Sequence, residues 1–239
     1  MRNYTIENNF PSINYVINNW PRTKPLLKKF ILSNHKPPDL YKICLSCLNE
    51  LGVYKTRKLE RILKRLTDIC SRNTTSNTFH DSHHFKAVII ISCIISKKMK
   101  LNQRDKILLI LIALSHDIAH QGRRIISQPY YQEDKSCKVF MQLCYEIHLT
   151  RKETNRVSKI FKSTYFPLKP ENVDDKLQKI ILDADILASI MFDVDTGLKF
   201  TSRLRHELRL SNSKESIFKS FLDTLTNKSL YMDSSRKLC

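Results

Sequence analysis

The sequence predicts an all-α fold. Only three glycines occur in 239 residues, Gly52, Gly122 and Gly197, whereas a sheet protein with many tight turns normally needs more of the residue that tolerates positive φ. Leu, Ile and Lys abound, and apolar residues recur at helical spacing along much of the chain. The two most apolar runs, residues 87–95 and 107–114, are shorter than the roughly 20 residues that a membrane-spanning helix requires. We therefore expect one main helical domain with a buried core and no membrane span.

Breaker residues divide the chain into predicted elements. Residues 1–37 are rich in Asn and Pro, which restricts helix formation, so we predict an N-terminal arm packed over a main domain of residues 38–239. Gly52 ends a helix, and Gly122 and Pro129 mark a loop. Between the breakers, the predicted helices cover residues 39–51, 55–71, 82–96, 104–120, 133–147, 152–163, 174–193 and 213–227.

The charge of the chain favours anionic partners. Lys and Arg outnumber Asp and Glu by 41 to 23, giving a formal charge of +18, and such a surface attracts nucleotides, nucleic acid or acidic lipid. Six of the basic residues alternate with Leu and Ile at helical periodicity in residues 55–66. This pattern favours the solvated face of an amphipathic helix over a nucleic-acid groove. The charge therefore leaves nucleic acid open as a partner without selecting it.

The cysteines and the N-terminus predict a cytoplasmic location. The seven cysteines are an odd number, and Cys93, Cys137 and Cys144 lie in apolar or amphipathic stretches, as reduced, buried thiols do. The opening residues MRNYTIENNF lack the basic region and apolar core of a signal peptide. We therefore expect a protein that is not secreted.

Polar residues with metal-ligating side chains lie in or beside apolar segments. His80 and His84 are four apart in FHDSHH, so their imidazoles share one face if both lie on a helix. His116 and Asp117 come at the end of an otherwise apolar helix. Burying an imidazole and a carboxylate there is unfavourable unless a partner or a metal compensates, so the pattern indicates a bound cation.

An aspartate in a third apolar helix completes the set. The segment IILDADILASIM contains Asp183 and Asp185, and because a spacing of two lets only one of them face the site, we choose Asp185. Each motif alone is weak, but nitrogen and oxygen donors from three helices can surround one octahedral ion and leave positions for water. The sequence thus predicts a divalent-metal site made of His84, His116, Asp117 and Asp185. Zinc, manganese, iron and magnesium all suit this donor set.

These motifs resemble those of the HD-domain metal-dependent phosphohydrolases, and within them the catalytic domain of the 3′,5′-cyclic nucleotide phosphodiesterases. FHDSHHFKAV is similar to the family's YHNxxHAxxV, ALSHDIAHQG to its ALxHDxxHxG, and ADILAS to its ADIS. The resemblance covers about residues 66–189. It implies a phosphodiesterase-like helical bundle around a metal site.

The resemblance also implies a role for each matching residue. The four predicted ligands match those of the family's first metal, with Asp117 bridging to a second ion and His120 lining the second-metal side. The ions would be two divalent cations, such as zinc, magnesium or manganese. In such a site a metal-bound hydroxide attacks phosphorus while the ions hold the phosphate oxygens. His80 matches the general acid that protonates the departing oxygen.

Several positions differ from the family pattern. Asp81 replaces the Asn of YHN, Phe79 replaces its Tyr, and no glutamine follows Asp185 where the family binds the purine base. Arg123 and Arg124 follow the second motif. Guanidinium matches phosphate oxygens geometrically, so these two arginines are candidate phosphate contacts, and a basic surface loop is an equally good explanation.

Three functions follow from these observations. The first is a metal-dependent 3′,5′-cyclic nucleotide phosphodiesterase with a small nucleotide substrate. The second keeps the enzyme class and changes the substrate to a dNTP, an alarmone or an oligonucleotide, which the positive charge favours. The third is a non-catalytic module that binds nucleotide or nucleic acid and keeps its metal for structure. His80 argues against the third, because a structural metal site needs no histidine on its open side. The sequence does not fix the oligomeric state.

Overall fold

Polar capping residues fix where several helices begin. Asp81 precedes α5 (Ser82–Ser96), and its Oδ1 accepts two backbone N–H groups of the first turn at 2.9 and 3.0 Å. Thr150 and Glu153 form a reciprocal capping box at the start of α8 (Arg151–Ser163). These side chains satisfy N–H groups that a first helical turn leaves without partners. Each of the two helices therefore starts at a defined residue.

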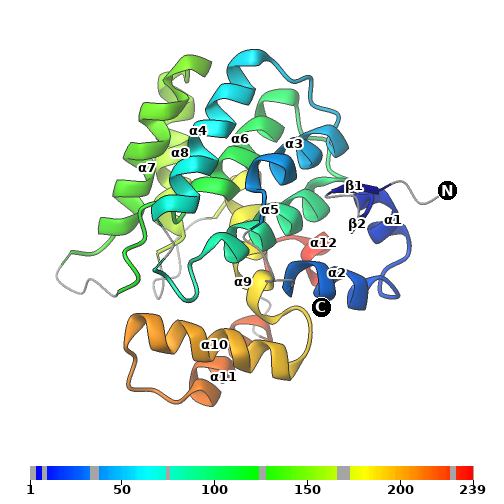
Figure 1. Ribbon diagram of the computed structural model, residues 1–239, viewed down its shortest axis with the longest axis vertical. Helices are drawn as coiled ribbons and strands as arrows, with labels where there is room; N and C mark the ends of the chain where they lie inside the picture. Colours follow the sequence, from blue (N-terminus) through cyan, green and yellow to red (C-terminus); the bar gives the residue numbers. More distant parts are fainter. Residues whose placement is uncertain are drawn as a thin grey trace.

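The computed structural model describes residues 4–6, 10–32, 38–73, 76–123, 128–165, 173–226 and 230–238. Figure 1 shows a bundle of helices with α10 and α11 lying below it. The other elements are β1 (Tyr4–Ile6), β2 (Phe10–Pro11), α1 (Ile13–Asn18), α2 (Lys24–Leu32), α3 (Leu40–Glu50), α4 (Arg57–Asn73), α6 (Gln103–Ser115), α7 (Tyr131–Cys144), η1 (Tyr145–Ile147), α9 (Lys176–Ile190), α10 (Val194–Leu208), α11 (Lys214–Thr226) and α12 (Asp233–Arg236). The all-α prediction is confirmed, since in the described part of the chain the strands form one short antiparallel pair and the other elements are helices.

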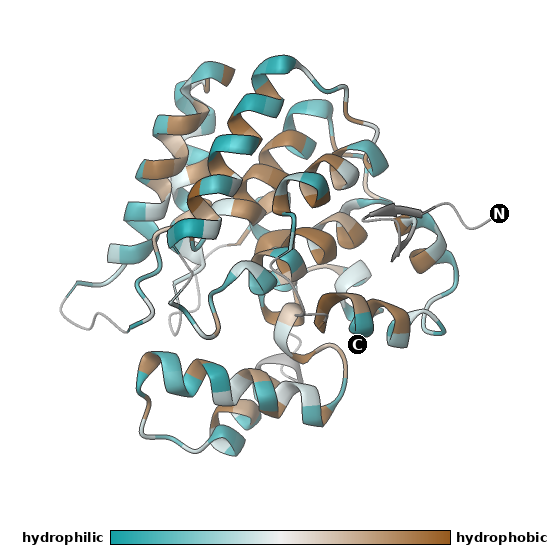
Figure 2. Ribbon diagram, viewed as in Figure 1, coloured by the Kyte–Doolittle hydropathy of each residue, from teal (hydrophilic) through white to brown (hydrophobic). Residues whose placement is uncertain are grey.

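Helix α5 is the centre of the bundle. Each of its residues from His84 to Ser96 is buried, and the helix packs against α3, α6 and α9. In Figure 2 the central helices are largely apolar, and the polar residues of α4, α7 and α8 lie toward the outside. Burial of apolar surface is the main favourable contribution to folding, so α5 is a rigid base for the side chains at its first turn. Among the described helices, none is long and apolar enough to cross a membrane.

Helices α1 and α2 contribute to the same core. Ile13 of α1 and Ile31 of α2 are buried within it. Lys86 of α5 is buried as well, and its Nζ donates a hydrogen bond of 2.9 Å to the carbonyl oxygen of Phe30 in α2. Where the structure describes residues 1–37, this proline-rich segment therefore contains two helices that pack on α5.

Two predicted helix boundaries are wrong. The helix predicted over residues 104–120 ends at Ser115, and residues 116–119 form a turn. In this turn the N–H of His120 donates to the carbonyl oxygen of Asp117 at 2.9 Å. The helix predicted over residues 174–193 ends at Ile190. It stops there because Asp193 caps another helix, with its Oδ1 accepting the N–H of Thr196 at 2.9 Å.

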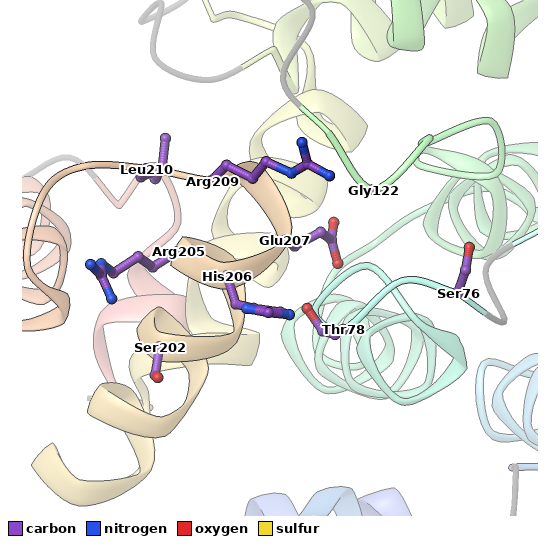
Figure 3. Close-up of a pocket in the computed structure, with 9 residues that line it drawn as sticks. All are labelled: Ser76, Thr78, Gly122, Ser202, Arg205, His206, Glu207, Arg209 and Leu210. Carbon is purple, nitrogen blue, oxygen red and sulfur yellow. The ribbon is translucent and has the colours of Figure 1, made fainter.

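That further helix, α10, occupies residues for which the sequence predicts no helix. It packs against α9 and α11. At the α10–α11 contact the ring of Phe218 lies so close to Gly197 that any Cβ there would overlap it. Packing against neighbouring helices, rather than local propensity, therefore stabilises α10. Its last turn carries Arg205, His206 and Glu207 along the edge of a pocket (Figure 3).

Candidate metal centre

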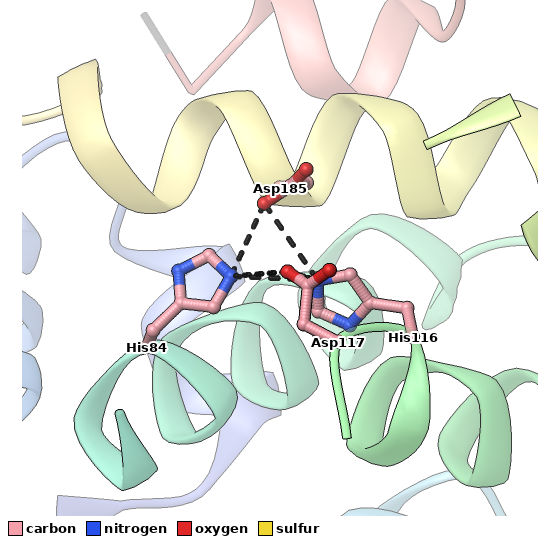
Figure 4. Close-up of side chains that lie close together, drawn as sticks. All are labelled: His84, His116, Asp117 and Asp185. Carbon is pink, nitrogen blue, oxygen red and sulfur yellow. Dashed lines mark hydrogen bonds and ion pairs between the residues drawn. The ribbon is translucent and has the colours of Figure 1, made fainter. Parts of the chain in front are cut away.

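Four side chains predicted as metal ligands meet between α5, α9 and the turn after α6 (Figure 4). His84 projects from the first turn of α5, His116 is the C-cap of α6, Asp117 follows it, and Asp185 comes from α9. One ligand atom from each residue lies within 4.8 Å of the others. We call these four residues the His/Asp cluster.

The distances within the cluster fit a single cation. His84 Nε2 lies 3.4 Å from His116 Nε2 and 3.3 Å from Asp185 Oδ1. Asp117 Oδ2 lies 3.1 Å from His116 Nε2 and 3.6 Å from His84 Nε2. Two ligand atoms that each bond a metal at about 2.1 Å are about 3.0 Å apart at right angles and about 3.4 Å apart at tetrahedral angles. The observed spacings lie near these values, so the donor set fits a divalent ion.

A hydrogen bond on the far side of His116 prepares its ring for this role. His116 Nδ1 lies 3.1 Å from the carbonyl oxygen of Ala113, which accepts a proton carried on Nδ1. With the proton there, Nε2 keeps its lone pair and faces the cluster. Metal-ligating histidines are commonly held in this way by a backbone carbonyl. The last turn of α6 thus fixes the tautomer as well as the position of His116.

The charges of the cluster favour a cation at its centre. Burial lowers the pKa of His84, but its hydrogen bonds with Asp117 and Asp185 outweigh burial and raise the pKa to about 9. Burial also raises the pKa of the two carboxyl groups, but the neighbouring imidazoles outweigh it and hold both below their ordinary range. The carboxylates of Asp117, which is almost fully buried, and Asp185, which is partly buried, therefore attract positive charge, which protons or a metal ion can supply.

A second group of polar residues adjoins the cluster, and we call it the His80 group: His80, His120 and Glu207. His80 lies just before α5 rather than on it. Its ring stacks on that of His120 with centroids 3.7 Å apart. Its Nδ1 lies 2.5 Å from Glu207 Oε1, and its Nε2 lies 3.8 Å from Asp117 Oδ2. His80 therefore connects the cluster to Glu207.

Glu207 is a residue of this region that the sequence reasoning missed. Its Oε2 accepts the backbone N–H groups of Phe79 and His80 at 2.6 and 3.1 Å. Burial raises the pKa of Glu207, but the hydrogen bonds from His80 and Phe79 outweigh burial and lower the pKa to about 2. An ionised carboxylate in contact with Nδ1 keeps a proton on that nitrogen and orients the ring. No local pattern around Glu207 marks it.

Two further buried acids lie close by. Glu133, in the first turn of α7, is buried, and burial together with the charge of Asp117 raises its pKa to about 7. Asp183 points away from the cluster, since its oxygens accept the backbone N–H groups of Tyr231 and Met232, both at 2.9 Å. Of the two aspartates in α9, only Asp185 therefore reaches the cluster.

Of the two arginines predicted as phosphate contacts, Arg123 lies in the described part of the chain and Arg124 does not. Arg123 is exposed, and its Nη2 donates to Gln121 Oε1 at 3.2 Å. Arg124 lies outside the described residues. Asp81, which departs from the resembled motif, caps α5 and accepts a hydrogen bond of 3.0 Å from Arg203 Nη2 of α10. The substitution at this position therefore ties the start of α5 to α10.

A pocket of about 510 Å³, which we call the His84 pocket, opens beside the cluster. Its lining includes His84, Phe79, Phe200, Lys199 and Ser189. The rings of Phe79 and Phe200 meet edge to face with centroids 6.4 Å apart. The pocket thus combines aromatic surface with polar and basic groups next to a predicted metal ligand.

The sequence matches no model of a known protein family, and no curated protein matches it. Among solved structures, the chain is similar to the crystal structure of the phosphodiesterase domain of the RhoPDE fusion protein from the choanoflagellate Salpingoeca rosetta. The two share 16% sequence identity with a TM-score of 0.55, and the match covers 81% of this chain and 73% of that chain. At this identity the likeness concerns the fold, and it agrees with the fold that the sequence motifs imply. The chain therefore has a phosphodiesterase-like helical fold, with a buried His/Asp cluster that could hold a metal ion.

Proposed function

We propose that this protein is a divalent-metal-dependent phosphodiesterase and that a 3′,5′-cyclic nucleotide is its first candidate substrate. The observation that carries the proposal is the position of His80 between the His/Asp cluster and Glu207. A metal site with a purely structural role has no use for such a histidine. A hydrolase needs one, because the departing alkoxide must receive a proton.

In the proposed reaction each residue has one task. His84, His116, Asp117 and Asp185 would hold the divalent ion, which on binding lowers the pKa of water and stabilises negative charge on phosphoryl oxygens. His80 would donate the proton on its Nε2 to the leaving oxygen. Glu207 accepts from Nδ1 and holds the imidazole in the orientation for this transfer.

The His84 pocket supports a nucleotide as the substrate. Aromatic rings such as Phe79 and Phe200 provide faces on which a base can stack. Lys199 and Ser189 supply polar groups to the same pocket. With a phosphate ester bound at the cluster, this pocket would be available to the organic part of the ligand.

The test measures metal content and hydrolysis on the same preparations. We expect purified wild-type protein to hold divalent metal and to cleave cyclic AMP or cyclic GMP, and His116→Ala to lose both properties because it removes one of the four proposed ligands. His148→Asn is the matched control, since His148 is exposed and its left-handed backbone suits Asn.

Other results would redirect or end the proposal. If wild-type protein holds metal and cleaves a dNTP, an alarmone or an oligonucleotide but no cyclic nucleotide, the proposed substrate changes and the proposed chemistry stays. Nucleotide binding without turnover of any of these, unchanged in His116→Ala, would replace the enzyme with a binding module.

A further inference from the structure

A separate pocket of about 590 Å³ lies at the C-terminal end of α10, and we call it the α10 pocket (Figure 3). It is bounded by α10, the segment before α5 and the loop after His120. The lining residues are Ser76, Thr78, Gly122, Ser202, Arg205, His206, Glu207, Arg209 and Leu210. Apart from the His206 imidazole, none of these described residues is aromatic, so the pocket offers little to a nucleobase.

The lining is chemically suited to an anion. Arg205 and Arg209 line it together with three hydroxyl side chains. In Figure 3 the Arg209 side chain extends over the pocket, whereas the Arg205 side chain, whose Nε donates to the carbonyl oxygen of Asn212 at 2.8 Å, points away from Glu207 and Gly122. The one acid, Glu207, already accepts hydrogen bonds from His80 and Phe79. Guanidinium and hydroxyl groups are common donors to phosphate oxygens, and hydrogen bonds to charged groups are the strong ones.

The backbone of Arg209 adds a second observation. Arg209 has φ 50° and ψ 45°, the left-handed conformation in which helices usually end with glycine. A residue with a side chain costs about 1 kcal/mol or more in this conformation. In Figure 3 the side chain extends across the pocket toward Gly122. This backbone conformation turns the chain at the end of α10 so that the guanidinium lies over the pocket.

The opposite wall is tied to the His80 group. Gly122 has φ 63°, and a Cβ there would lie 2.6 Å from Asn77 Oδ1. Asn77 Nδ2 in turn donates to the carbonyl oxygens of His80 and His120, both at 3.1 Å. Because Glu207 lines the pocket and contacts His80 Nδ1, the pocket lies on the side of His80 away from Asp117.

We propose that the α10 pocket binds a phosphate group of the substrate. The preferred substrate then carries this phosphate group in addition to the phosphodiester that is cleaved. This inference rests on the proposed function, in which His80 protonates the leaving group. A leaving group that continues past His80 would meet the guanidinium of Arg209. A linear dinucleotide with a terminal phosphate has this extra group, whereas a cyclic mononucleotide lacks it. The pocket therefore favours the oligonucleotide alternative over the cyclic nucleotide, with the same proposed chemistry at the His/Asp cluster and His80.

The kinetic test compares a 5′-phosphorylated adenine dinucleotide with its 5′-hydroxyl counterpart. We expect wild-type protein to have a kcat/KM about tenfold higher for the phosphorylated compound, which corresponds to about 1.4 kcal/mol. Arg209→Gly should bring this ratio close to one. The substitution also relieves the left-handed strain, so loss of folding does not explain the change. Arg151→Ala, an exposed arginine of α8, is the control and should keep the ratio.

A binding test separates this inference from the proposed function. Pyrophosphate is titrated by calorimetry into full-length His116→Ala protein, whose metal centre is removed, and into His116→Ala/Arg209→Gly. Binding that disappears with Arg209 supports the pocket even if no ester is cleaved. No binding to the first protein overturns the inference.

A free effector is the other source of a phosphate group. If pyrophosphate alters cleavage of the 5′-hydroxyl dinucleotide without competing with it, and Arg209→Gly abolishes this effect, the pocket is regulatory and the assignment to the substrate is overturned. Competition confined to the phosphorylated dinucleotide supports the assignment.

Discussion

At the scale of single residues, the orientation of His80 depends on one carboxylate. Glu207 accepts from His80 Nδ1 at 2.5 Å and from the backbone N–H of the same residue at 3.1 Å. A ring held on one nitrogen presents the other in a fixed direction, which here leads toward Asp117. In the proposed enzyme, Glu207 would therefore be a positioning residue that acts through His80.

Replacing Glu207 with Gln is expected to impair proton donation while leaving metal binding intact. The amide keeps the shape but loses the charge that orients an imidazolium, so kcat for a nucleotide ester should fall about 10- to 100-fold. Hydrolysis of a 4-nitrophenyl phosphodiester should fall much less, because this leaving group departs without a proton. Metal content and KM should not change, and Glu215→Gln on the exposed part of α11 is the control.

An equal loss of kcat on both esters would show that Glu207 serves the structure alone. An equal loss of kcat on both esters together with loss of metal would mean that Glu207 supports the His/Asp cluster. Only a selective loss on the ester with the poor leaving group agrees with positioning of an acid.

The sequence predicted the residues of the His/Asp cluster and missed Glu207 for one physical reason. A histidine or aspartate inside an apolar helix conflicts with its surroundings, and that conflict is visible locally in His116 or Asp185. Glu207 lies between basic residues in a polar stretch, where an acid is unremarkable. Its partner His80 is 127 positions away, and only the tertiary fold brings the two together.

At the scale of elements, α8 shows how local chemistry sets a helix. Its capping box joins Thr150 and Glu153, and Arg104 of α6 donates to the same carboxylate through Nε at 2.6 Å. The hydrogen bond from Arg104, with help from Thr150, lowers the pKa of Glu153 from its ordinary 4.5 to about 2. The ionised form is therefore favoured by the folded state.

The stability contributed by Glu153 should depend on pH in a defined direction. Because its pKa is lower in the folded than in the unfolded state, the contribution is complete above about pH 4.5 and is lost as the pH falls toward 2. Glu153→Gln should lower the free energy of unfolding by about 1 kcal/mol at pH 7. Urea titrations at pH 7, 5 and 3 should find the difference shrinking at the lowest pH. A difference that stays constant from pH 7 to pH 3 would contradict this.

Prediction of elements succeeded where the signals were local and failed where they were not. The start of α5 follows from Asp81, and the separation of α3 from α4 follows from Gly52. Helix α10 has few apolar residues and carries Gly197 in its first half, so its sequence alone favours no helix. It forms because α9 and α11 cover it, and that information lies in other parts of the chain.

At the scale of the whole molecule, the proposed ligands join segments far apart in sequence. They come from α5, the end of α6 and α9, and these helices also form the centre of the core. An ion bound by all of them would favour the folded over the unfolded chain, in which the ligands are dispersed. Metal binding and global stability should therefore be linked.

Removal of metal is expected to lower the melting temperature. At an ion concentration 100 times Kd the folded state gains about 2.7 kcal/mol, which for a chain of this size corresponds to roughly 5–10 °C. Differential scanning calorimetry with and without a chelator measures the shift. His116→Ala should melt at the same temperature in both buffers, while His148→Asn should behave like the wild type. A chelator without effect on the wild type would contradict the proposed centre.

The bond between His80 and Glu207 joins the central bundle to a helix that lies outside it (Figure 1). The proposed metal ligands all belong to the bundle, whereas the carboxylate that directs His80 belongs to α10. In the proposed enzyme, binding of the ion and orientation of His80 as the acid would thus depend on different parts of the chain. A disturbance confined to α10 and α11 would leave the metal centre occupied but the protein inactive. Metal content would therefore not measure the fraction of molecules that is active.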